Sequence, residues 1–140
     1  MRNGKTVVST MNYCGAVMVD QQLSSGKCSW KIRLDRHDPE NNCVIGVWAG
    51  DYPLNRTVAL NIWGLGTSGK KFIKGKTSDW KSECKTGDLI EVRIDFNNGK
   101  GVLGFCRNNE LLGNICHHIY PPVYPVVECK GSIHQCSLIN

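Results

Sequence analysis

The sequence predicts an all-β protein with no substantial helix, built as a β-sandwich or as a barrel. Several short segments alternate apolar and polar residues, which places the apolar side chains on one face of an extended strand. Clusters of glycine, proline, asparagine and serine separate these segments at intervals of roughly 8–12 residues. No segment keeps a helical apolar period over two or more turns. These three observations together predict about ten short strands.

The first strands are expected in the first fifty residues. Residues 6–9 and 16–19 are rich in β-branched side chains, and they predict two short strands. Residues 30–35 alternate apolar with charged side chains, as in a half-buried strand. Residues 44–48 show no alternation, which indicates a strand that is buried on both faces.

The middle of the chain is expected to alternate strands with loops. Residues 58–63 alternate and predict a strand that ends at Gly64. Residues 66–69 contain two glycines and predict a flexible loop, and residues 70–74 predict a short basic strand. Residues 77–85 are polar and irregular, so no strand is expected there.

Residues 86–113 predict a three-stranded meander, the clearest sheet signal in the chain. Its apolar side chains Ile90, Val92, Ile94 and Phe105 are expected to fill the space between two sheets. Asparagine-rich turns separate the three strands, since asparagine and glycine tolerate positive φ.

A closing pair of strands is predicted near the end of the sequence. Three of the five prolines lie within residues 119–125, which excludes a helix in that segment. Residues 126–129 and 132–139 follow, and each predicts a strand.

Composition is that of an ordinary globular domain. The 140 residues are 41% hydrophobic and 21% charged, and we expect a single domain over residues 1–140. The N-terminus begins with charged residues and lacks the apolar region of a secretory signal, so a cytoplasmic location is expected. The formal net charge of +5 does not decide the class of partner.

Eight cysteines are present, and we expect most of them to be free thiols. Without a secretory signal, a chain of this size does not predict a disulfide framework. Cys28, Cys43, Cys106 and Cys129 lie in or beside apolar strand patterns, where a free cysteine acts as a small buried hydrophobe.

Two patterns resemble cofactor sites but lack the necessary context. Residues 64–69 match G-x-G-x-x-G, yet the following residues are β-like, so no helix would cradle a phosphate and a glycine-rich turn is favoured. Metal-capable side chains also occur near the end of the sequence, but their spacing does not preset a ligand set; they are Cys116, His117, His118, His134 and Cys136. No catalytic triad or carboxylate pair is recognisable, so we predict no enzyme, no cofactor and no metal.

One stretch leaves a nucleic-acid-binding β domain as an alternative. Lysines at 70–85 are interleaved with aromatic residues, a composition suited to tracking a phosphate backbone and stacking bases. The favoured interpretation is an edge strand whose lysines face solvent. The residues concerned are Lys70, Lys71, Lys74, Lys76, Lys81, Lys85, Trp63, Phe72 and Trp80.

Several segments, taken in order, resemble the SPRY domain family from about Val7 to the end of the sequence. A glycine precedes the Trp30-Lys31-Ile32 strand, and Gly87-Asp88 opens the strongest of the matching patterns. The matching segments are residues 25–32, 44–47, 51–54, 87–95, 101–105, 109, 112–113 and 120–127. The resemblance implies a two-layer antiparallel β-sandwich of the concanavalin-like jelly-roll type.

The same resemblance implies a non-catalytic protein–protein interaction module. Members of the family bind a peptide or protein surface with loops at one end of the sandwich, often as the substrate-recognition part of a ubiquitin ligase. We therefore expect an adaptor in a ligase or signalling complex, with a protein or peptide ligand, no nucleic-acid or membrane partner, and a monomeric state.

The peptide pocket of SOCS-box members is kept only in part. Asp51, Pro53, Leu54 and Gly131 match that pocket, but its tryptophan position is occupied by Lys130, so a different ligand is expected. The resemblance implies these candidate ligand contacts: His37, Ala49, Gly50, Asp51, Tyr52, Leu54, Lys130 and Gly131.

Overall fold

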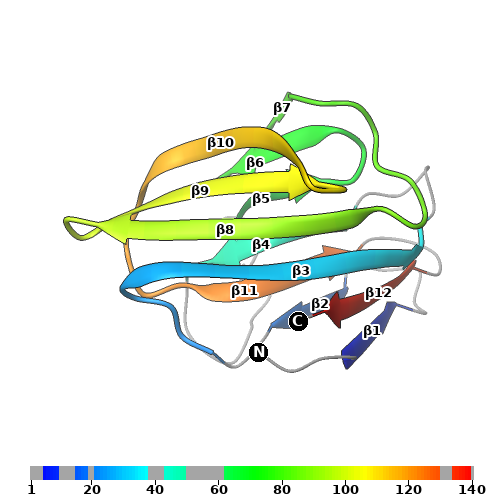
Figure 1. Cartoon of the computed structure of the whole chain (residues 1–140), viewed down its shortest axis with the longest axis horizontal. Helices are drawn as coiled ribbons and strands as arrows, with labels where there is room; N and C mark the ends of the chain where they lie inside the picture. Colours follow the sequence, from blue (N-terminus) through cyan, green and yellow to red (C-terminus); the bar gives the residue numbers. More distant parts are fainter. Residues whose placement is uncertain are drawn as a thin grey trace.

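A computed structural model describes residues 5–9, 15–18, 21–37, 43–49, 62–129 and 134–139. Twelve strands in these ranges form two six-stranded sheets, and every paired strand is antiparallel (Figure 1). The predicted two-layer antiparallel sandwich is therefore confirmed.

Sheet A contains the predicted meander at one side and the first and last described strands at the other. Its order is β1 (Lys5–Ser9), β12 (His134–Ile139), β3 (Gly26–Arg36), β8 (Leu89–Asn97), β9 (Lys100–Arg107) and β10 (Glu110–Ile119). Sheet B has the order β2 (Gly15–Met18), β11 (Tyr124–Cys129), β4 (Cys43–Trp48), β5 (Ile62–Gly66), β6 (Lys70–Ile73) and β7 (Lys76–Asp79).

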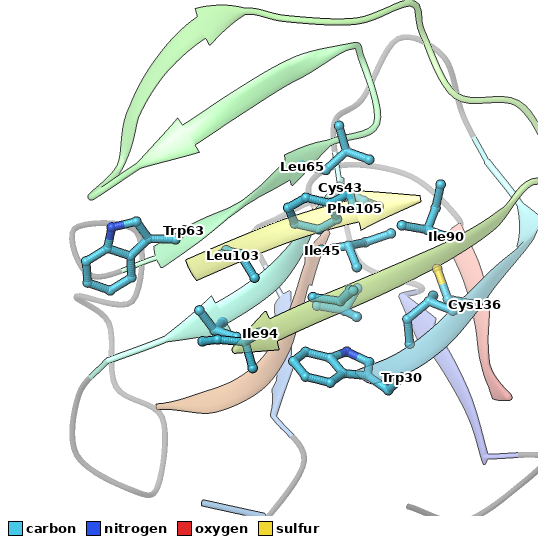
Figure 2. Packing of buried hydrophobic residues seen from close by; sticks show 14 of the residues in the cluster. Trp30, Cys43, Ile45, Trp63, Leu65, Ile90, Ile94, Leu103, Phe105 and Cys136 are labelled. Atoms are coloured by element: carbon cyan, nitrogen blue, oxygen red, sulfur yellow. The ribbon is translucent and has the colours of Figure 1, made fainter. Parts of the chain in front are cut away.

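The main hydrophobic core lies between the two sheets (Figure 2). The predicted meander residues Ile90, Val92, Ile94 and Phe105 are each at most 1% exposed, so their predicted place in the core is confirmed. Side chains from sheet B meet them there, among them Ile45 (Figure 2). Complete burial of side chains of this size stabilises the fold by about 1.5–3 kcal/mol each.

Strand β4 is buried along its whole length, as its unbroken apolar sequence predicts. It lies inside sheet B, between β11 and β5. Ile45 and Val47 join the core between the sheets, whereas Val44 and Trp48 belong to a second, smaller cluster. Because neighbouring side chains on a strand point to opposite faces, both faces of β4 are apolar.

The glycine-rich stretch begins as a strand, which corrects the prediction that the strand ends at Gly64. Strand β5 continues to Gly66, and the turn starts at Thr67. Gly64 pairs with Gly46 of β4, and a Cβ atom at Gly46 would collide with the backbone carbonyl oxygen of Trp63. These glycines therefore allow two buried strands to approach closely.

Two further elements differ from the predictions. Strand β7 occupies part of the segment expected to be irregular, and all four of its residues are exposed. Strand β10 runs to Ile119 rather than ending at Gly113, with register shifts that interrupt its pairing with β9. An exposed edge strand and a bulged strand both lack the regular apolar alternation that sequence patterns detect.

Most of the cysteines that the structure describes are buried. Cys43, Cys106 and Cys129 are buried as predicted, while Cys28 is half-buried. Cys84 and Cys136 are also buried. Within the described ranges, no helix is long and apolar enough to cross a membrane.

Candidate functional site

The structure describes only two of the eight predicted contact residues, His37 and Ala49. His37 directly follows β3, and Ala49 directly follows β4. The other candidates lie outside the described residues: Gly50, Asp51, Tyr52, Leu54, Lys130 and Gly131.

His37 lies at an end of the sandwich that we call the Thr86 end, formed by His37, Thr86, Asp88, Arg107 and Asn108. The backbone N–H of His37 donates to Thr86 Oγ1 at 3.1 Å. The side chain is half-buried, and both ring nitrogens are shielded from solvent. The end of β3 is thus tied to the segment that precedes β8.

Asp88 organises the Thr86 end. Its carboxylate accepts a hydrogen bond from the Lys85 backbone N–H at 2.8 Å and another from Asn108 Nδ2 at 3.0 Å. Its backbone carbonyl accepts from the Leu34 N–H at 2.9 Å. The Gly87-Asp88 pair that resembles the family pattern therefore has a structural role, because it connects β3, β8 and the β9–β10 turn.

Arg107 fixes the segment before Thr86. Its guanidinium donates to the Ser82 carbonyl at 2.8 Å and to Ser82 Oγ at 2.7 Å. Nearby, burial raises the pKa of the Cys84 thiol, although the Arg107 guanidinium works in the opposite direction. Cys84 is 1% exposed and belongs to the main core, so it has a packing role.

Ala49 lies at the opposite end, which we call the Tyr120 end, formed by Ala49, the β8–β9 turn and Tyr120. Trp48, just before Ala49, pairs with Tyr124 at the start of β11, whereas Cys43 pairs with Cys129 at its finish. Ala49 packs against the core. Tyr120 follows β10 and is 62% exposed.

The structure does not bring His37 and Ala49 together. Six residues of β4 span about 20 Å, and Figure 1 shows β3 and β4 finishing at opposite ends of the sandwich. Residues 50–54 are attached to β4 at the Tyr120 end, whereas residues 130–131 follow β11 at the Thr86 end. The attachment points of the candidates therefore divide between the two ends.

The sequence motifs that resemble cofactor sites do not form such sites in the described residues. Residues 64–66 of the G-x-G-x-x-G stretch lie in strand β5, and the stretch is followed by strand β6 rather than by a helix. Cys116 on β10 and Cys136 on β12 are separated in sheet A by β3, β8 and β9. Within the ranges that the structure describes, no group of three metal-ligating side chains is assembled.

The basic and aromatic stretch does not provide a stacking surface. Trp63 is 5% exposed, and Phe72 packs against a buried cluster. Trp80 makes an edge-on contact with Phe105, with ring centroids 6.3 Å apart. Lys70 pairs with Asp79 at 2.8 Å on the β6–β7 hairpin at the edge of sheet B. The nucleic-acid alternative therefore receives no support, because its aromatic residues serve the fold.

A cavity of about 580 Å³ lies against sheet A, and its lining reaches close to the β8–β9 turn at the Tyr120 end. Its volume suits a small molecule, but charged and polar side chains line much of it, and Arg93 donates to Glu91 at 3.1 Å. The lining residues are Lys27, Cys28, Ser29, Glu91, Arg93, Ile94, Asp95, Val102 and Asn114. Sequence reasoning missed this cavity, since its residues come from four separate strands.

Comparison with known proteins identifies the fold. No known family model matches the sequence, and no curated protein is significantly similar to it. Among solved structures, the chain resembles the SPRY domain of human HERC1 with a TM-score of 0.80 and 16% sequence identity. The likeness covers 96% of this chain and 87% of the HERC1 domain. The protein therefore has a SPRY-like β-sandwich fold, as the sequence resemblance implies.

Proposed function

We propose that this protein is a non-catalytic protein–protein interaction module that recognises a peptide or protein surface. The observation that carries the proposal is the fold, which matches a SPRY domain over nearly the whole chain. Rigid β scaffolds present recognition residues on their connecting loops. In this proposal the module is monomeric and cytoplasmic, and it serves as the recognition or adaptor part of a ubiquitin-ligase or signalling complex.

The Tyr120 end is the preferred recognition surface. Tyrosine is enriched among the residues that dominate binding energy at protein interfaces, because its ring buries a large area at a small cost in conformational entropy. Tyr120 and Leu111 are the large hydrophobic side chains that stand exposed in the described residues. Tyr120 is followed by Pro121 and Pro122, which restrict the local backbone.

The predicted contacts supply the rest of this surface. Ala49 is at the Tyr120 end, and Gly50, Asp51, Tyr52 and Leu54 follow it in the chain. Nearby, Gln22 Nε2 donates to the hydroxyl of Tyr124 at 3.3 Å. In this proposal the ligand lies across Tyr120 and the segment after Ala49. His37, Lys130 and Gly131 form a separate group with a secondary role.

Affinity capture from lysate with quantitative mass spectrometry tests this proposal. Tyr120→Ser and Tyr52→Ala are expected to lower the yield of captured partners at least tenfold relative to the unsubstituted protein. Leu111→Ser is the matched control, since Leu111 is an exposed hydrophobic side chain on β10, the strand that Tyr120 follows, but at the Thr86 end. Lys130→Glu tests whether the separate group formed by His37, Lys130 and Gly131 contributes to binding.

The outcomes separate the alternatives. Loss of the partners with Lys130→Glu but not with Tyr120→Ser would move recognition to the Thr86 end. Capture that nuclease abolishes, or that weakens steeply as salt rises, would instead indicate nucleic acid. Ubiquitin-ligase subunits among the lost partners would support the ligase role, and light scattering of the purified protein tests the monomeric state.

A further inference from the structure

Three cysteines meet at one end of the core. Cys43 is the first residue of β4, Cys129 is the last residue of β11, and Cys136 is on β12. Cys43 and Cys136 are labelled among the core residues in Figure 2. Their exposed fractions are 0%, 3% and 1% respectively, so all three thiols are enclosed by protein.

The sulfur atoms of Cys43 and Cys129 are 2.6 Å apart. This separation is shorter than a normal contact between two thiols, although it exceeds the disulfide bond length of about 2.05 Å. The two residues are also direct partners in the β4–β11 ladder. Antiparallel partners have Cα atoms about 4.5–5.5 Å apart, within the range of about 4.4–6.8 Å that a disulfide requires.

From this geometry we propose that Cys43 and Cys129 form a disulfide bond that joins strands β4 and β11 within sheet B. The bond requires little movement of either strand, because pairing has already placed both residues side by side. It would lie where residues 38–42 lead into β4 and residues 130–133 leave β11, and so would hold those two strand ends together.

The oxidant in this proposal is a small disulfide such as glutathione disulfide. One cysteine thiolate attacks the small disulfide, releasing one small thiol and forming a mixed disulfide. The second cysteine, after losing its proton, displaces the other small thiol. The protein loses two protons and two electrons in total, and the oxidant takes them up as two thiols.

The thiol of Cys136 contacts Cys129 and so affects the ionisation of the pair. Contact with the Cys136 thiol favours the Cys129 thiolate, but the contact with Cys43 and burial outweigh it, so the pKa of Cys129 is raised. Contact with Cys129, together with burial, also raises the pKa of Cys136. Few thiolates are therefore present at neutral pH, and oxidation is expected to be faster during folding than in the folded protein.

Mass spectrometry of the oxidised protein tests the bond. The protein is refolded from denaturant, or incubated while folded, in a glutathione disulfide buffer at pH 8, and then acid-quenched and alkylated under denaturing conditions. The expected product has two fewer alkylated cysteines and a peptide linkage between Cys43 and Cys129. Its melting temperature is expected to rise by roughly 5–15 °C relative to the reduced protein.

Matched variants identify the pair. Cys43→Ala is expected to abolish the linkage and the rise in melting temperature. Cys106→Ala is the control, since Cys106 is also buried but lies on β9 of sheet A, whereas β4 and β11 belong to sheet B. Strands β3 and β8 also separate Cys106 from Cys136 on β12. Cys136→Ala is expected to retain the Cys43–Cys129 linkage.

Two results would overturn the proposal. One is a full count of free thiols in both the refolding and the folded samples. The other is a linkage of Cys129 with Cys136 in place of Cys43. The experiment measures a bond rather than partner capture, so its outcome is independent of the proposed recognition function.

Discussion

The two ends of the sandwich differ in how their loops are held. At the Thr86 end, side chains form hydrogen bonds with the backbone of neighbouring segments. The Asp88 and Asn108 side-chain oxygens accept backbone N–H groups, and the Arg107 guanidinium donates to a backbone carbonyl. At the Tyr120 end, a large aromatic side chain remains 62% exposed. Substitutions should therefore affect stability at the first end and binding at the second.

The largest stability effect is expected for Thr67→Val. Thr67 is fully buried, and its hydroxyl oxygen accepts the Cys43 backbone N–H at 2.9 Å. Valine keeps the shape but leaves that buried N–H without its acceptor, which should lower the free energy of unfolding by about 1–3 kcal/mol. Urea denaturation measures the change, and Thr67→Ser, which keeps the hydroxyl, is the control. Equal losses in both variants would contradict a role for this hydrogen bond.

A slightly smaller loss is expected for Asn108→Ala. The Asn108 side chain accepts from the Leu89 N–H at 2.9 Å and donates to Asp88 at 3.0 Å. Its φ of +52° is also unfavourable for alanine. We expect a loss of about 1–2 kcal/mol by thermal or urea unfolding. Asn108→Gly removes the same hydrogen bonds without the backbone strain, and it should be the milder substitution.

A pH-dependent effect is expected at Asp35, close to the end of β3. Burial opposes ionisation there, but hydrogen bonds from Ser137 and Arg33 outweigh it, so the pKa of Asp35 is lowered from its usual value of 3.8. The folded state thus gains stability above that usual pKa, and the gain is lost as pH falls through the lower, folded-state pKa.

Unfolding measured between pH 6 and pH 2 tests this contribution. The unsubstituted protein should lose more stability over that range than Asp35→Asn does. Asp79→Asn is the control, because hydrogen bonding to Lys70 likewise lowers the pKa of Asp79, but its side chain is 93% exposed. Solvent screening should make the control effect small. Identical pH profiles for Asp35→Asn and the unsubstituted protein would refute the contribution.

The smallest stability effect is expected for Tyr120→Ser. An exposed side chain loses few contacts on truncation, so the free energy of unfolding should change by less than about 0.5 kcal/mol. This is the same variant that should lose captured partners, so the pair of measurements separates recognition from folding. A large loss of stability in Tyr120→Ser would mean that Tyr120 supports the fold, and the contrast between the ends would fail.

Much of the fold could be predicted because burial leaves a periodic record in the sequence. Strand β8 alternates regularly, and the structure buries Ile90, Val92 and Ile94 on one face. Strand β7 was missed because Lys-Thr-Ser-Asp has no buried face and hence no pattern. The end of β5 was missed because glycine signals both a turn and a close approach of two strands.

The candidate site was harder to predict for a topological reason. Motif matching orders residues along the chain but does not say at which end of a strand they lie. His37 and Ala49 flank β4 on its two sides, so the length of that strand separates them. Tyr120 was overlooked because exposure of an aromatic residue beside prolines has no distinctive sequence pattern. The cysteine pair was missed because the partners are far apart in sequence.

The strand order also has a kinetic consequence. Strand β1 pairs with β12, and β2 pairs with β11, so the earliest described strands find their partners near the far end of the described chain. The β8–β9–β10 and β5–β6–β7 hairpins, by contrast, join close neighbours. Because closing long loops slows folding, the hairpins should form first and both sheets should be completed late. On the ribosome, β1 and β2 must wait unpaired until β12 and β11 have been synthesised.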